Sequence, residues 1–244
     1  MSDIITLGID DLVVDLDELF PELPPGNIYI ALTGGVESTI LLYLMLEKYS
    51  ANRIIACTFR FGDRRRWEFG NAKKMADKFG IRHVEAGYLE NSAPLIKELP
   101  TSREYFNREN LVFNNIKQQD STFVAGFTGK NTTTLDPENI TPEEQSKYLI
   151  WYSVHRPFLK MDKHHTIDLF YKLGAENLLG LTQSCQRFGD RHCGDCHACW
   201  ERIYAFEQLG KKDPAIYQQD YDLLAKKVKS YFHQRWPRHV KEAK

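Results

Sequence analysis

The chain has 244 residues, of which 42% are hydrophobic and 27% charged, with a formal net charge of −1. This length and composition suffice for one large domain, or for one domain with a substantial appendage. The near-neutral charge gives no general argument for nucleic-acid binding, and no apolar run approaches the ~20 residues of a membrane-spanning helix. Because the acidic N-terminus lacks the apolar core of a signal peptide, we expect a cytoplasmic protein.

The first 26 residues contain many acidic side chains and neither Lys nor Arg. Pro21, Pro24 and Pro25 close this segment and separate it from the apolar run that follows. We interpret it as a short extension packed on the main domain, with a helical turn at residues 15–20 and a solvated acidic face.

Short apolar runs then alternate with amphipathic segments, which predicts strands alternating with helices. We expect strands at residues 28–32, 53–59, 82–88, 121–127 and 154–159, and helices at residues 39–48, 67–79, 104–119 and 163–173. This order is typical of an α/β, Rossmann-like fold, in which a parallel twisted sheet carries helices on both faces. Ligands of such sheets bind outside the carboxyl ends of the strands. A polar loop at residues 128–144 is long enough for a binding or lid role.

A cysteine-rich segment and two helices, at residues 197–208 and from Asp213 to about Gln234, complete the chain. The last helix leads into a basic tail, which we interpret as a solvated surface. A nucleic-acid or partner role for this tail stays open but is not favoured. The predicted organisation is an acidic N-terminal extension (1–26), a nucleotide-binding α/β domain (27–180), and a zinc-binding, helical C-terminal segment (181–244).

The turn after the first strand reads Thr33-Gly34-Gly35-Val36-Glu37-Ser38-Thr39. Backbone amides in such a turn, together with a helix N-terminus, form an anion site suited to phosphate, and glycines let the chain approach the ligand closely. The spacing matches neither the Walker loop nor the dinucleotide fingerprint. It resembles the PP-loop of the ATP pyrophosphatases, usually written S-G-G-x-D-S.

This resemblance implies that ATP binds here and is cleaved between its α- and β-phosphates, so that a substrate becomes adenylated. Thr33 takes the place of the first Ser, and Glu37, one methylene longer, stands where the superfamily has Asp. That length matters if the acid holds Mg²⁺ or fixes the loop. The residues that the resemblance implies for binding ATP are Leu32, Thr33, Gly34, Gly35, Val36, Glu37, Ser38, Thr39 and Phe59.

Four of the five cysteines fall within fifteen residues, with the spacing Cys185-x7-Cys193-x2-Cys196-x2-Cys199. In a reducing compartment this pattern indicates a metal site more than disulfides. Tetrahedral Zn²⁺ takes four thiolates, and C-x2-C loops bring two sulfurs to one metal, so we expect a closed, structural zinc site. An iron–sulfur cluster is the alternative.

The combination of the two motifs resembles the 7-cyano-7-deazaguanine synthases, of which this chain looks like a diverged member. The residues from Phe59 to Arg65 are similar to the family's F-x-Y-G-Q-R-H stretch, and the segment from Ser184 to Cys199 matches its S-C and C-G-x-C-x-x-C elements. The likeness covers about residues 28–210. It departs at residues 127–136, where the family has a substrate segment written D-x-x-G-Y-P-D-C.

The resemblance implies an ATP-dependent C–N ligase. A heteroaromatic carboxylate of the 7-carboxy-7-deazaguanine type would be adenylated and converted with ammonia to an amide and then a nitrile. The implied catalytic residues are Glu37, Ser38, Arg60 and Arg64. In this scheme the loop amides and Mg²⁺ hold the leaving pyrophosphate, and Arg60 or Arg64 neutralises charge and steers the carboxylate. A homodimer is also implied.

Two other hypotheses remain. A sulfur-transferring PP-loop enzyme that acts on tRNA would need a reactive cysteine in its site, whereas the clustered cysteines are committed to metal. A non-catalytic module that binds nucleotide or nucleic acid would keep the fold and the zinc, and the basic tail favours it slightly.

Overall fold

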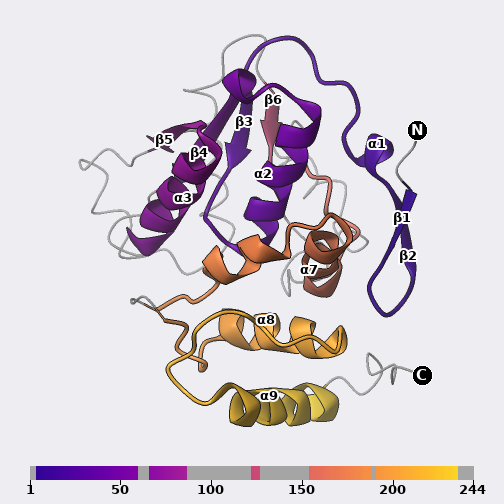
Figure 1. Cartoon of the computed structure of the whole chain (residues 1–244), viewed down its shortest axis with the longest axis vertical. Helices are drawn as coiled ribbons and strands as arrows, with labels where there is room; N and C mark the ends of the chain where they lie inside the picture. Colours follow the sequence, from indigo (N-terminus) through magenta and orange to yellow (C-terminus); the bar gives the residue numbers. More distant parts are fainter. Residues whose placement is uncertain (1–3, 60–65, 87–121, 127–153, 188–190, 236–244) are drawn as a thin grey trace, which may run out of the picture.

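The computed structural model describes residues 4–59, 66–86, 122–126, 154–187 and 191–235 (Figure 1). A five-stranded sheet with the order β5-β4-β3-β6-β7 forms the centre. All neighbouring strands pair in parallel. Its strands are β3 (Ile28–Ala31), β4 (Ile54–Phe59), β5 (Arg82–Ala86), β6 (Thr122–Val124) and β7 (Val154–His155).

The strand order places a topological switch point beside β3. From β3 the chain builds outward through β4 and β5, and it returns to pair β6 on the other side of β3. In open sheets of this kind the crevice beyond the carboxyl ends of the strands at the switch point is where ligands bind. The glycine-rich turn follows β3 directly, so the fold puts it at that crevice.

Alternating side chains of β3 pack into two hydrophobic clusters, one on each face of the sheet. Ile28 and Ile30 are fully buried in the main core, whereas Tyr29 belongs to a smaller cluster on the opposite face of the sheet with Ile55 and Cys57. Such burial on both faces is expected of a parallel sheet that is covered on both sides. It explains why these strands read as continuous apolar runs.

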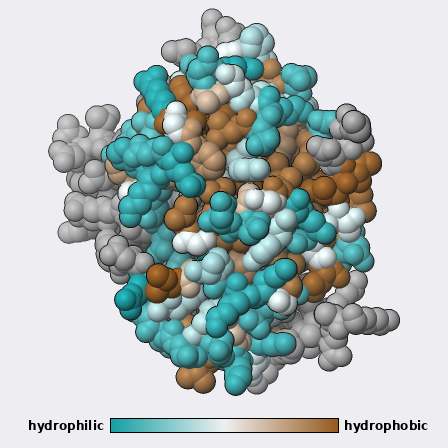
Figure 2. Space-filling model, viewed as in Figure 1, coloured by the Kyte–Doolittle hydropathy of each residue, from teal (hydrophilic) through white to brown (hydrophobic). Residues whose placement is uncertain are grey.

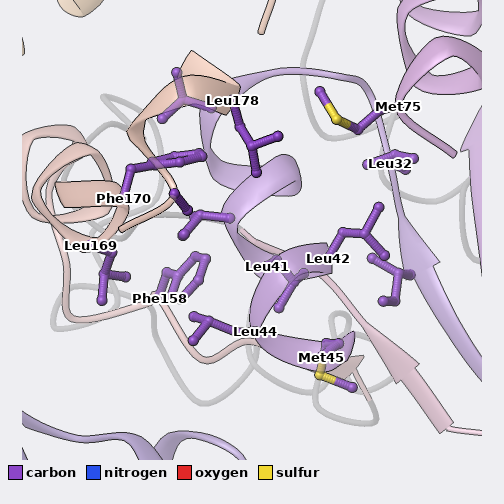
Figure 3. Packing of buried hydrophobic residues seen from close by; sticks show 14 of the residues in the cluster. Leu32, Leu41, Leu42, Leu44, Met45, Met75, Phe158, Leu169, Phe170 and Leu178 are labelled. Atoms are coloured by element: carbon purple, nitrogen blue, oxygen red, sulfur yellow. The ribbon is translucent and has the colours of Figure 1, made fainter. Parts of the chain in front are cut away.

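The helices that pack with the sheet in the main core include α2 (Val36–Lys48), α3 (Arg66–Phe79) and α7 (Lys163–Lys172). Helix α2 is buried on most of its circumference because it lies between the sheet and α7 (Figure 3). On one side Leu32 and Met75 approach it, and on the other Leu169 and Phe170. The two-sided burial accounts for the apolar residues that α2 carries on more than one face.

The acidic N-terminal segment is folded. Strands β1 (Ile4–Leu7) and β2 (Leu12–Asp15) form an antiparallel hairpin, and the short helix α1 (Leu16–Leu19) follows, capped by the Asp15 carboxylate. Leu7, Val14 and Phe20 are buried in the main core. The predictions of a packed extension and of a helical turn are confirmed, but the hairpin was not predicted, and the segment is not merely a solvated acidic face.

The C-terminal part consists of the 3-10 helix η4 (Glu176–Leu181), the cysteine segment, α8 (His197–Gln208) and α9 (Tyr221–Arg235). The two α-helices pack against each other below the sheet domain (Figure 1). Their contact forms a second hydrophobic cluster that includes three of the cysteines, Ile203 and Val228. On the face in Figure 2, hydrophilic residues cover most of this lower half of the molecule.

The start of the last helix was predicted wrongly. It begins at Tyr221 and not at Asp213, because the Asp213 carboxylate is buried and binds Arg202 and Tyr217 instead of capping a helix. The predicted helix at residues 104–119 and the polar loop at 128–144 lie outside the described residues. Within the described residues, no helix is long and apolar enough to cross a membrane.

Candidate functional site

The turn between β3 and α2 is fixed by two hydroxyl groups. The Thr33 amide donates to Ser38 Oγ at 3.2 Å, and the Gly35 amide donates to Thr33 Oγ1 at 3.2 Å. Ser38 Oγ donates to the Gly35 carbonyl at 3.3 Å and lies 3.1 Å from Thr33 Oγ1. The hydroxyls of the motif therefore hold the loop in shape, and Thr33 performs this task where the superfamily has Ser.

The two glycines of the turn have different surroundings. Gly34 has φ +75°, and a Cβ on it would lie 2.7 Å from Asn71 Cβ and 2.8 Å from the Asn71 carbonyl carbon. The loop is thus pressed against the backbone of α3, which tolerates no side chain. Gly35 is the N-cap of α2 and has no side chain to cap the first amides of that helix, which leaves its N-terminus suited to a phosphate.

A lysine from a distant helix completes this site. Lys163, the first residue of α7, is only 9% exposed, and its Nζ lies 3.0 Å from Glu37 Oε1 and 3.6 Å from Glu201 Oε2. Burial alone would lower the pKa of Lys163, but the two carboxylates hold it above its ordinary value. A charged ammonium group therefore lies beside the acidic residue of the loop, where it can neutralise phosphate charge.

The segment that leads to the cysteines touches the turn directly. The Gln183 amide donates to the Gly34 carbonyl at 2.9 Å, so the glycine is held between this segment and α3. The neighbouring Thr182 accepts a hydrogen bond of 2.6 Å on its Oγ1 from Arg202. The turn after β3 and the C-terminal segment thus share one hydrogen-bonded junction.

Arg202 and Asp213 anchor that junction as a buried ion pair. Both side chains have 0% exposure, and the guanidinium group donates to the carboxylate through Nε at 2.6 Å and Nη2 at 2.9 Å. Although burial would raise the pKa of Asp213, the Arg202 charge and its hydrogen bonds hold it below the ordinary value. Burial would likewise lower the pKa of Arg202, and Asp213 keeps it raised. The pair is therefore ionised, and Arg202 donates its hydrogen bonds to groups inside the protein.

The four cysteines of the C-terminal motif converge. Their sulfur atoms all lie within 4.8 Å of one another, and those of Cys193 and Cys199 are 3.9 Å apart. Four sulfurs around Zn²⁺ at ~2.3 Å would be separated by about 3.8 Å in a tetrahedron. Amides of the segment donate to these sulfurs, for example from Arg187 to Cys185 at 3.3 Å and from Cys196 to Cys193 at 3.3 Å. Such donors stabilise thiolates, so the residues fit a four-thiolate metal ion.

The structure brings some of the predicted site residues together, while others lie outside the described residues. Thr33, the two glycines, Glu37 and Ser38 lie together in the turn, and Leu32 is fully buried at its start with its amide donating to the Cys57 carbonyl. Thr39 is fully buried in the first turn of α2. Arg60 and Arg64 lie outside the described residues, and Phe59 is described only as the last residue of β4. Their assigned roles stay predictions.

The sequence interpretation missed Lys163, which it treated only as the start of a helix. Lysines at helix ends are common on protein surfaces, so the sequence carried no signal for this one. Its role depends on α7 packing against α2, a contact between segments far apart in the chain.

Comparisons with known proteins agree with the two motifs. The family model for queuosine biosynthesis protein QueC matches residues 143–210, and the asparagine synthase model matches residues 27–115. The 7-cyano-7-deazaguanine synthase of Archaeoglobus fulgidus is 26% identical over 218 residues, covering 78% of this chain and 90% of that protein. The one of Caldicellulosiruptor saccharolyticus is 27% identical, covering 79% and 96%. Over about three quarters of its length, the chain is therefore similar in sequence to proteins named 7-cyano-7-deazaguanine synthase.

Solved structures show weaker likeness. The U34-tRNA thiolase NcsA from Methanococcus maripaludis with its [4Fe-4S] cluster has a TM-score of 0.49 and 12% identity, covering 93% of this chain and 77% of that one. The NMN synthetase from Francisella tularensis has a TM-score of 0.46 and 11% identity, covering 89% and 90%. Likenesses of this size carry no conclusion about the chemistry of this chain.

Proposed function

We propose that the chain is an ATP-dependent C–N ligase of the 7-cyano-7-deazaguanine synthase type, acting on a heteroaromatic carboxylate such as 7-carboxy-7-deazaguanine. The observation that carries this proposal is the turn from Thr33 to Ser38 with Lys163 beside Glu37. A glycine turn without a cation could be a simple strand-to-helix connection. A buried, charged lysine beside the loop acid supports the proposal of a polyphosphate site.

In the first half-reaction, a carboxylate oxygen of the substrate attacks the α-phosphorus of ATP. The bond from that phosphorus to the bridging oxygen breaks, and pyrophosphate leaves with both electrons. The chain's part is to orient the phosphates on the amides after Gly35 and to neutralise the developing negative charge with Lys163. Glu37 is the residue that would hold Mg²⁺, which when bound would offset further phosphate charge.

In the second half-reaction, ammonia attacks the acyl carbon and AMP leaves, which gives an amide. The amide oxygen then attacks the α-phosphorus of a second ATP, which releases pyrophosphate and one N–H proton; loss of AMP and of the second N–H proton gives the nitrile. Neither step requires a covalent nucleophile of the protein. The four cysteines would hold a structural Zn²⁺ that keeps residues 182–184 in place against the loop. We further propose that the protein works in the cytoplasm as a homodimer.

The test is a product assay with the purified protein, ATP, Mg²⁺, ammonium and 7-carboxy-7-deazaguanine, in which AMP and pyrophosphate are measured and the acyl-adenylate, amide and nitrile are sought by mass spectrometry. We expect AMP and pyrophosphate in equal amounts, and only when the carboxylate is present. Lys163→Met should lower the rate by at least ~10-fold, since one charge-assisted contact to the phosphates is lost. The exposed Lys160 provides the control variant Lys160→Met.

The other hypotheses make different predictions for the same assay. Intact ATP binding without turnover on any carboxylate would support a non-catalytic module and contradict the ligase. Turnover that appears only with tRNA would support the tRNA-modifying enzyme. Metal analysis of the purified protein decides between one Zn²⁺ and an iron–sulfur cluster.

A further inference from the structure

The turn of the N-terminal hairpin meets the start of α7 through one aspartate and two histidines. Asp10 Oδ1 lies 2.7 Å from His165 Nε2 and 3.3 Å from His164 Nε2. Both histidines are buried, with 1% and 5% exposure, and their ring centroids are 3.9 Å apart. We call Asp10, His164 and His165 the hairpin clasp. Asp10 lies before the stretch of about residues 28–210 in which the sequence resembles known enzymes, whereas His164 and His165 lie within that stretch.

The hydrogen bonds determine the tautomer of one histidine. The Asp162 amide donates to His165 Nδ1 at 2.9 Å, so Nδ1 carries a lone pair and the ring proton is on Nε2. His165 therefore donates to Asp10. The three side chains are close enough to suggest a metal site, but with its proton on Nε2 His165 has no lone pair there for a metal. A hydrogen-bonded clasp accounts for the geometry better than a metal ion does.

The hairpin turn is fitted closely to the helix. Gly8 has φ +72°, its amide donates to Asp168 Oδ2 at 2.9 Å, and a Cβ on it would lie 2.6 Å from His165 Cδ2 and 2.7 Å from His164 Cδ2. The turn thus grips the first two turns of α7 at its amide and at the Asp10 carboxylate. A loosely appended extension would need neither a side-chain-free residue nor a shared carboxylate at this point.

The clasp lies next to the candidate site in the chain. Lys163 immediately precedes His164 at the first position of α7, and its Nζ meets Glu37 of the loop. We propose that Asp10 is a positioning residue, which holds the first turn of α7 so that Lys163 faces the phosphate loop. Only the consequence for ATP rests on the proposed function; the effect of Asp10 on Lys163 does not.

The first experiment measures the chemical reactivity of the Lys163 amino group in the absence of any ligand. The full-length protein is treated with acetic anhydride, and acetylation of Lys163 is followed by mass spectrometry relative to the exposed Lys160. Asp10→Asn keeps the shape of the side chain and removes its charge. It should raise the acetylation rate of Lys163 about five- to tenfold, as expected when a charge-assisted hydrogen bond that limits local opening is weakened. Lys160 should not change.

The matched control is Asp11→Asn. Asp11 is the next residue in the same turn, it is exposed, and its φ of +54° suits Asn. This variant should leave the acetylation of Lys163 unchanged. Equal rates in the wild type and in Asp10→Asn would overturn the proposal. So would a rise in thermal stability on adding Zn²⁺ that Asp10→Asn abolishes, because the clasp would then be a metal site.

The second experiment measures whether Asp10 affects ATP binding through Lys163. Asp10→Asn should weaken Mg-ATP binding several-fold by calorimetry in the wild-type background and have no further effect in Lys163→Met, since the two changes act through one group. A purely structural role would weaken binding equally in both backgrounds and contradicts the positioning role. If the wild type binds no ATP, the proposed function fails, while the acetylation experiment still decides the role of Asp10.

Discussion

Replacing Gly34 by alanine tests how closely the phosphate turn is packed. Two costs arise: φ +75° is unfavourable by about 1–2 kcal/mol for a residue with a Cβ, and the new methyl group would approach the backbone of α3. At 2.7 and 2.8 Å from Asn71 Cβ and carbonyl carbon the contact is too short, and the backbone there cannot rotate away. Overpacking of this kind costs about 1–3 kcal/mol.

Together these terms predict that Gly34→Ala lowers the free energy of unfolding by about 2–5 kcal/mol. Gly80→Ala is the matched control, because Gly80 has φ +64° but a Cβ added to it would meet nothing within 4 Å. It should cost only about 1 kcal/mol, from the backbone conformation less the gain from restricting the unfolded chain. Both values come from urea unfolding followed by circular dichroism. Equal losses in the two variants would refute the close packing of the loop on α3.

Three further predictions concern stability. Asp213→Asn leaves Arg202 buried without its charged partner and should lower the free energy of unfolding in urea by about 3–5 kcal/mol. Asp222→Asn removes an exposed ion pair with a lysine and should change it by no more than about 0.5 kcal/mol. Similar losses in the two variants would contradict the importance of the buried pair. Removing the proposed metal with a chelator should loosen residues 185–199 and the second hydrophobic cluster. Amide hydrogen exchange should become faster in these residues and stay slow in the sheet. Unchanged exchange would contradict a structural metal. Burial holds the pKa of His164 below its ordinary value, so the unfolded chain takes up that proton first. Stability is therefore complete above about pH 6.5 and falls as the pH drops below it. His164→Asn should flatten this slope between about pH 7.5 and 5.5, and an unchanged slope would contradict the assignment.

The glycine turn between β3 and α2 could be located from the sequence because its pattern is local. Two adjacent glycines, flanking hydroxyls and a following helix lie within seven residues, and their spacing alone indicates a phosphate site. The central strands were predictable for a related reason, since burial on both faces makes them short, continuous apolar runs. For the cysteines, two overlapping C-x2-C spacings bring Cys193, Cys196 and Cys199 together, and the structure adds Cys185 to them.

The parts that were missed depend on contacts between distant segments. Lys163 gains its role only when α7 packs beside α2, and nothing in its neighbourhood in the sequence shows that contact. The strands of the N-terminal hairpin have only four residues each and are surrounded by acidic side chains. The sequence pattern therefore did not predict that Leu7 and Val14 are buried. Asp213 before a proline looked like a helix start, but its carboxylate binds Arg202 from another helix.

The most direct test of the account is the stoichiometry of ATP cleavage. Purified protein is supplied with ATP, Mg²⁺, ammonium and 7-carboxy-7-deazaguanine, and AMP, pyrophosphate, ADP and phosphate are measured together with the mass of the product. We expect AMP and pyrophosphate in equal amounts, dependent on the carboxylate, with the amide and the nitrile as products. Lys163→Met should lower the rate of AMP formation strongly. Formation of ADP and phosphate, or tight ATP binding with no carboxylate-dependent AMP, would contradict it.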